Sequence, residues 1–166
     1  MRNAFKTPIK TLAGARRMGV ICGLALAMAG GGAAAQDEVL DGAQDWHPFS
    51  RSAVRLYMAE MKGMVTEGDV HRVTLAVVPL QGEAGDYSHS EEIVEFRCAA
   101  KESRSVAAMD FGADGVQTDR YDDASSWEAY NPNGRDGFLA GLVCDGNRAN
   151  PPTWPSIKAW VDAGRK

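Results

Sequence analysis

Ile93-Val94-Glu95-Phe96-Arg97-Cys98 alternates apolar and polar residues, which is typical of a β-strand with one buried face. A second stretch, Phe138-Leu139-Ala140-Gly141-Leu142-Val143-Cys144, repeats apolar residues at helical spacing. Each stretch ends in a cysteine. A bond between Cys98 and Cys144 would close the chain between them into one loop and hold a helix against a sheet.

Alternation outside these stretches predicts more strands. The turn signal Asp114-Gly115 separates two of them. Strands this close together, without helical periods between them, favour an antiparallel meander. We therefore predict an α+β fold: a small antiparallel sheet of about five to six strands, with a C-terminal helix tied to one face by the disulfide. The other predicted strands are 54–59, 70–78, 102–111 and 116–121, and the helix is 135–144, with Phe138, Leu139, Leu142 and Val143 on its apolar face.

The first 35 residues have the three-part layout of a secretory signal peptide. They carry five basic residues and no acidic one, then the mostly apolar run Met18 to Ala29, then the small residues Ala33-Ala34-Ala35 before Gln36. The apolar run is shorter than the roughly 20 residues that span a bilayer. Cys22 has no small-residue lipobox before it. We expect export to the periplasm or beyond, with no transmembrane anchor after cleavage.

Charge narrows the range of partners. Cleavage after Ala35 would leave 13 basic and 22 acidic residues, a net charge of −9 against −4 for the whole chain. An acidic surface repels phosphate backbones, so nucleic acid is not expected as a partner.

Cleavage would also remove Cys22 and leave two cysteines. An exported chain with two cysteines most simply carries one disulfide. The alternatives are a free pair or a metal site. Cys98 and Cys144 are too far apart for a CxxC motif, and no histidine lies near either of them in the sequence.

The sequence predicts four segments: a signal peptide (1–35), a loose lead-in (36–50), the sheet-and-helix domain (51–146), and a linker with a short amphipathic tail helix (147–166). Trp46 is expected to be the first core residue. In the tail, Ile157, Trp160 and Val161 share one side of the helix. Whether the tail packs on the sheet is left open.

No motif indicates catalysis, a cofactor or a metal site. The chain lacks a Gly-x-Ser-x-Gly elbow and an HExxH pair. Asp110, Asp114 and Asp119 lack the ligand spacing of an EF-hand. A hydrolase would need a polar cleft, for which His71 with Asp119 or Glu95 is the candidate pairing. The scattered histidines (His47, His71, His89) and the aromatic residues Trp127, Tyr130, Trp154 and Trp160 are interpreted as structural, although exposed aromatics would favour an interface.

The middle of the chain resembles the surface-adhesin protein E-like family. The resemblance rests on the run Val94 to Lys101, the strand to Phe111, Asp114-Gly115, and then Trp127, Pro132 and Val143-Cys144. It covers residues 55–144 and implies a small antiparallel sheet with a disulfide-tied helix. The named member of this family is an outer-surface adhesin that binds host proteins.

The function expected from the sequence is that of an exported, non-enzymatic binding domain that recognises a protein or a cell-envelope component. Its binding residues are not identified by any motif. The alternatives are a small periplasmic structural or oligomeric module, in which a sheet edge pairs with another copy, and a periplasmic hydrolase.

Overall fold

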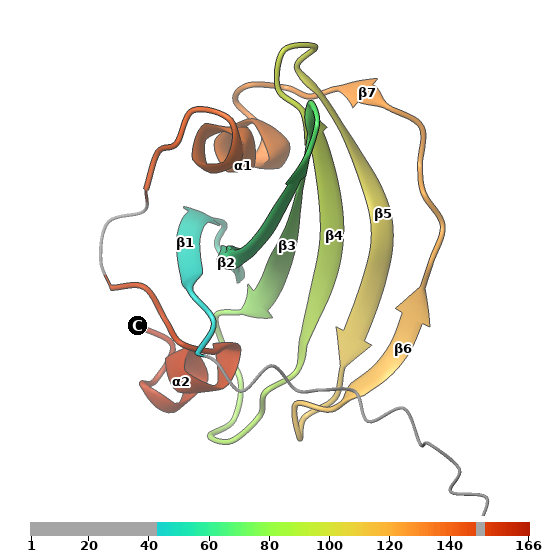
Figure 1. Ribbon diagram of the computed structural model, residues 1–166. Coiled ribbons are helices and arrows are strands. Elements are labelled where there is room, and N and C mark those ends of the chain that lie inside the picture. Colours follow the sequence, from blue (N-terminus) through green and yellow to red (C-terminus); the bar gives the residue numbers. More distant parts are fainter. Residues whose placement is uncertain (1–42, 149–151) are drawn as a thin grey trace, which may run out of the picture. The chain divides into compact units, whose positions relative to one another are not determined.

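Six antiparallel strands follow one another across the sheet in sequence order, so the fold is a meander, as predicted (Figure 1). The computed structural model describes residues 43–148 and 152–166. The predicted signal peptide and the first part of the lead-in lie outside these residues. The strands are β1 (Trp46–Arg51), β2 (Arg55–Glu67), β3 (Val70–Pro79), β4 (His89–Arg97), β5 (Glu102–Phe111) and β6 (Gln117–Tyr121), and a two-residue strand, β7 (Glu128–Ala129), pairs with β5.

Two short helices follow the sheet, α1 (Arg135–Val143) and α2 (Ile157–Asp162). Most of the regular structure in the described part of the chain is strand. The α+β prediction is therefore confirmed for an antiparallel sheet with a C-terminal helix and a disulfide, in a domain that is mostly sheet.

The two helices cover opposite faces of the sheet. Along β3, Val73 and Leu75 belong to the core cluster that contains α1. Ala76 and Val78 belong to the cluster that contains α2. Because successive β positions alternate between faces, each helix covers its own face. The buried residues of α1 are Leu139, Ala140, Leu142 and Val143, and those of α2 are Ile157, Trp160 and Val161.

The tail packs on the sheet, which answers the question that the sequence left open. Trp46 and Trp154 exchange two backbone hydrogen bonds, of 2.9 and 3.0 Å, and form an antiparallel bridge along the free edge of β1. Ser156 caps α2 by accepting a hydrogen bond from the backbone N–H of Ala159 at 3.0 Å. The three apolar residues that share one side of this helix are buried.

The lead-in prediction is wrong at its C-terminal end. Residues 46–50 are not loose, because they form most of β1 and pair with β2. Trp46 is completely buried, which confirms it as a core residue. Its neighbours in the fold are Glu60 and Trp154, both distant in sequence, and this long-range pairing orders the segment.

The predicted strand 54–59 is too short, because β2 continues through Gly63 to Glu67. The pairing of β2 with β3 is irregular between Glu60 and Val65. The buried Glu60 side chain accepts hydrogen bonds from the backbone N–H groups of Asp45, Lys62 and Gly63, at 2.9, 3.1 and 2.6 Å. These bonds satisfy backbone donors in the irregular region, so the strand continues where a glycine suggested a break.

Two details of the predicted helix and strand differ in the structure. Phe138 is 49% exposed, and Ala140 takes its place on the buried face of α1. β4 ends at Arg97, so Cys98 lies in the turn after the strand instead of on its face. Both cysteines are half-buried.

Cys98 and Cys144 form a disulfide with their Cα atoms 5.5 Å apart. Cys144 is the C-cap residue of α1, so the bond ties the end of that helix to the turn after β4. This confirms the predicted pairing. The tie holds the helix at one end of the sheet, and the chain reaches it by way of β7 (Figure 1).

We expect Cys98→Ser to destabilise the domain by roughly 4 kcal/mol, because the bond closes a long loop in the unfolded chain. Urea unfolding of the oxidised protein measures the change. The double variant with Cys144→Ser should match the single variant, since either change removes the same bond. Complete labelling of both thiols in untreated protein would contradict the pairing.

Candidate functional site

The structure does not bring together the residues that the sequence suggested for a hydrolase. His71 lies opposite Phe96 in the pairing of β3 with β4, whereas Glu95 lies opposite Arg72. Adjacent strand residues point to opposite faces, so His71 and Glu95 lie on different sides of the sheet. Asp119 is in the exposed strand β6. His71 instead makes a 3.0 Å hydrogen bond with the hydroxyl of Thr66.

The other two histidines have local structural partners. His47 is buried, with its Nε2 atom 2.8 Å from Asp45. His89 stacks on Phe111 with 4.3 Å between ring centroids. Their contacts agree with the structural interpretation from the sequence.

The three aspartates considered for calcium lie in one hairpin, two in its strands and one in its turn. Asp110 and Asp119 lie opposite one another in β5 and β6. Asp114 accepts a hydrogen bond from the Val116 N–H at 2.9 Å, which closes the turn between these strands. Within residues 43–148 and 152–166, no three His, Cys, Asp or Glu side chains are grouped so that they could hold a metal ion.

A buried carboxylate organises the charged part of the sheet. Glu95 is only 2% exposed and lies between two arginines on neighbouring strands. Its Oε1 accepts from Arg72 Nε at 2.9 Å and Nη2 at 2.5 Å. Its Oε2 accepts from Arg104 Nε at 2.8 Å. Burial acts to raise the pKa of Glu95, but the hydrogen bonds from the two guanidinium groups outweigh it and hold the pKa below its usual value.

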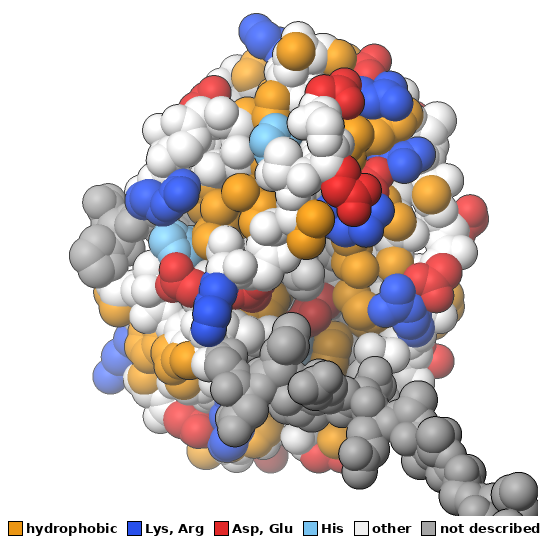
Figure 2. All heavy atoms as spheres, in the orientation of Figure 1, with side chains coloured by type: hydrophobic (Ala, Val, Ile, Leu, Met, Phe, Trp, Pro, Cys, Tyr) orange, Lys and Arg blue, Asp and Glu red, His pale blue; other side chains and the backbone are white. Residues whose placement is uncertain are grey.

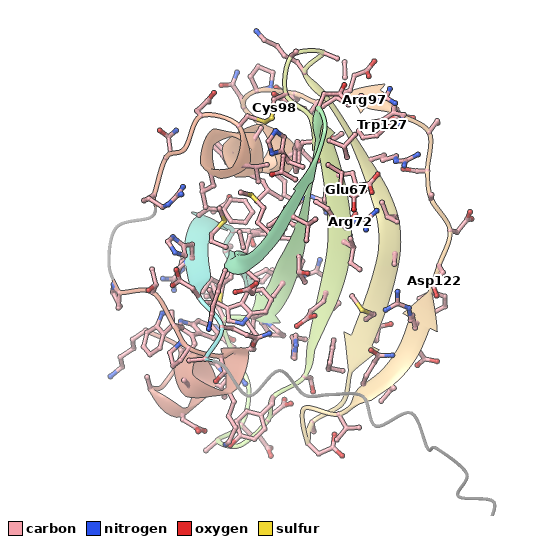
Figure 3. The ribbon with its side chains drawn as sticks, in the orientation of Figure 1. Glu67, Arg72, Arg97, Cys98, Asp122 and Trp127 are labelled. Carbon is pink, nitrogen blue, oxygen red and sulfur yellow. A yellow bond between two sulfur atoms is a disulfide. The ribbon has the colours of Figure 1, made fainter. Side chains whose placement is uncertain are left out.

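Trp127 lies over the same face, against two guanidinium groups. The Arg97 and Arg104 guanidinium carbons are 4.1 and 4.5 Å from the indole centroid. We call these three residues the Trp127 stack; Figure 3 shows Arg97 and Trp127 side by side near β7. Arg104 belongs both to the stack and to the Glu95 network, so the buried carboxylate fixes one side of the indole site.

The segment 122–131, which we call the strap, places this tryptophan. Ser125 bonds the backbone of Ser105, with its N–H donating to the Ser105 carbonyl at 2.9 Å. Glu128 then pairs with Ser103 in β7. Because neighbouring positions of an extended segment alternate, Trp127 points to the Glu95 side of the sheet and Glu128 points to the other.

The surface around the Trp127 stack is only partly covered by the described elements. Trp127 is half-buried, and the Arg72 side chain remains 47% exposed although it bonds Glu95. α2 packs against residues of β1, β2 and β3 on this face. Figure 2 shows acidic, basic and hydrophobic side chains interspersed over the visible surface, without a large field of one charge.

An open polar pocket of about 480 Å³ lies on the α1 side of the sheet. It is lined by residues of β5, the strap and the first turn of α1. Its lining includes serine hydroxyls, carboxylates and the Arg135 guanidinium. The structure thus defines a disulfide-tied antiparallel sheet domain with a half-exposed aromatic–arginine cluster on one face and a polar pocket on the other.

Comparisons with known protein families, with curated proteins and with solved structures find no match to this chain. The resemblance to the surface-adhesin protein E-like family therefore stays a prediction. Among the described residues, no helix is both long enough and apolar enough to cross a membrane.

Sequence reasoning interpreted Trp127 as a core or lid residue and did not connect it with Arg97 or Arg104. It did assign Glu95 and Arg97 to the same strand face, and the structure shows both on that face. Alternation in the sequence also puts Glu102 and Arg104 on one strand face, but the register that aligns Arg104 with Glu95 is known only from the structure. Nothing in the local sequence indicates that the strap returns to this point.

We expect Glu95→Gln to lower stability by roughly 1–3 kcal/mol at pH 7, because it removes a buried, doubly paired carboxylate. The folded-state pKa is depressed, so this contribution is present above the unfolded value of about 4.3 and is lost as the pH falls through the folded pKa. The free energies of unfolding of the two proteins, measured between neutral and acidic pH, should converge once the pH is below the folded pKa of Glu95.

Glu102→Gln is the matched control for this prediction, since Glu102 is a partly exposed strand residue in a looser ion pair with Arg97, at 3.7 Å. Its effect should stay below about 1 kcal/mol. Equal effects of the two substitutions would show that the burial of Glu95 is unimportant.

Proposed function

We propose that this chain is an exported, non-enzymatic binding domain that recognises a protein or a component of the cell envelope. The proposal is supported by the Trp127 stack, a half-exposed tryptophan in contact with two arginines on a sheet face. Tryptophan and arginine are the residues most enriched at interface positions that contribute most of the binding energy. The resemblance to the surface-adhesin protein E-like family implies the same class of function.

The stack is ordered before any partner arrives. Arg104 is fixed by two contacts with Glu95, of 2.8 and 2.7 Å. Trp127 has only two side-chain torsions and packs against two guanidinium groups. Little side-chain entropy remains to be lost on binding, so a partner gains more of the contact energy.

The chemistry of the stack favours a protein partner that offers carbonyl or carboxylate groups beside an apolar side chain. The indole contributes apolar area, and the guanidinium edges donate hydrogen bonds in a fixed fork. Arg72 extends this row of donors along the same face (Figure 3).

Export remains part of the proposal and depends on the leader, residues 1–35, with cleavage expected near Gln36. The disulfide is consistent with an oxidising compartment such as the periplasm or the exterior.

An oligomeric module is the second candidate, because β6 is an exposed edge strand. Two copies paired about a two-fold axis could match all five residues of β6 only in the register centred on Asp119. That register sets Asp119 against Asp119 of the second copy, and like charges directly opposite are destabilising. The edge therefore favours a monomer over a dimer of this kind.

We expect the mature protein, beginning at Gln36, to scatter light as a monomer at micromolar concentration. Asp119→Asn removes the repulsion and serves as the comparison, since any increase in association should appear first in that variant. A stable dimer of the unmodified protein would favour the oligomeric module instead.

Binding through the Trp127 stack is tested with the mature protein immobilised and exposed to solubilised envelope of the native cell. The captured component is identified, purified and titrated against variants. We expect Trp127→Ala to weaken its binding by about thirtyfold, the effect of losing roughly 2 kcal/mol at a central interface residue. The variant should unfold close to the unmodified protein, since Trp127 is only half-buried.

Tyr121→Ala is the matched control, because Tyr121 is an aromatic residue of β6 that is 57% exposed and lies outside the stack. It should leave the affinity unchanged. Equal binding by Trp127→Ala and the unmodified protein would exclude the stack as the interface.

A further inference from the structure

The polar pocket lies on the opposite side of the sheet from the Trp127 stack. Ser103 and Ser105 of β5 pair with Phe96 and Val94, which belong to the core that α1 covers. Glu128 pairs with Ser103 and therefore shares this face. The chain runs from β7 across the end of the sheet to α1 (Figure 1), and residues of this connection also line the pocket.

An ion network forms the inner wall of the pocket. Arg135 Nη1 donates to Glu92 Oε2, and Arg135 Nε donates to Asp136 Oδ1, both at 2.6 Å. Asp136 also accepts from the Ser103 hydroxyl at 3.0 Å. One guanidinium between two carboxylates leaves no excess positive charge at this wall.

Within this wall the charges are therefore paired, whereas Glu128, which also lines the pocket, makes no ion pair with any described residue. Hydrogen-bonding capacity also remains. Arg135 Nη2 and Glu92 Oε1 make no hydrogen bond with any residue that the structure describes. The hydrogen bonds of these two side chains use Arg135 Nε and Nη1 and Glu92 Oε2 instead. Asn131 uses its side-chain oxygen to accept from the Asn133 N–H, which leaves its amide donors for other partners. Serine hydroxyls around them can both donate and accept.

This arrangement selects the chemical class of a ligand. An anion would meet three carboxylates, two of them already paired with the single guanidinium of the wall. An apolar ligand would bury polar groups without partners, which is unfavourable. A neutral molecule with many hydroxyl groups supplies donors and acceptors together and needs no counter-charge. The volume of about 480 Å³ falls within the range of small-molecule sites.

We propose that this pocket binds a neutral saccharide unit, as a second site distinct from the Trp127 stack. The saccharide hydroxyls bond the free edge of the Glu92–Arg135 pair and the serines of β5 and the strap. The site goes beyond the proposed protein-binding function and does not depend on it.

Amide NMR of the mature protein, titrated with three probes at millimolar concentration, tests the site. The probes are a neutral glucose oligomer, a neutral N-acetylglucosamine oligomer and inorganic phosphate. We expect saturable shifts at Ser103, Ser105, Ser125 and Tyr130 with at least one oligomer, and none there with phosphate. Residues 81–85, far along the chain from the pocket lining, serve as the internal reference.

Ser105→Val removes a lining hydroxyl and fills its space with a residue suited to a strand. It should weaken the saccharide affinity by about tenfold. Ser50→Val makes the same change in β1, outside the pocket, and should leave the affinity unchanged. Arg97→Ala should also leave it unchanged, because Arg97 belongs to the Trp127 stack; failure of the stack to bind protein would not alter this result.

Two results would overturn the proposal: no pocket shifts with either oligomer, or equal affinities of Ser105→Val and the unmodified protein. Shifts with phosphate alone would also overturn it, since they would assign the pocket to an anion.

Discussion

The Cys98–Cys144 disulfide is the constraint on which both candidate surfaces depend. It ties the turn after β4 to the end of α1, so the chain between them must leave the sheet and return to the same end of it. β5, β6, the strap and α1 all lie within this closed loop. The strap then follows the edge of β5, where β7 pairs with Glu102 and Ser103. The cross-link closes the loop that contains the strap, and the pairing with β5 holds the strap against the sheet.

Each face of the sheet also carries one network of paired charges. On the Trp127 side, two arginines enclose the buried carboxylate of Glu95. On the α1 side, two carboxylates enclose Arg135. The first network leaves guanidinium groups at the surface and suits a partner with acceptors and apolar area. The second leaves no free positive charge and suits a neutral polar ligand. The two surfaces thus differ chemically, because the central group is a carboxylate in the first network and a guanidinium in the second.

Much of the fold could be predicted from sequence because its signals are local. Alternation located β3, β5 and β6 closely and the C-terminal half of β4, and helical spacing with the cysteine count located α1 and its cross-link. β1 was missed because its order comes from pairing with Glu60 and with Trp154, which periodicity within the strand cannot reveal. β2 was cut short because Gly63 suggests a break, whereas the buried Glu60 side chain satisfies the backbone there.

The candidate sites were harder to predict than the fold because one short segment builds both of them. The strap has no periodicity of its own beyond two paired residues, yet its alternation sends Trp127 to one face while Glu128 points to the other. A segment this short cannot shift one of these side chains without turning its neighbour. A ligand that orders the strap from the pocket side therefore also restricts the indole on the opposite side. The two surfaces are chemically distinct, but they share a backbone, and the pairing of the strap with β5 holds that backbone in place.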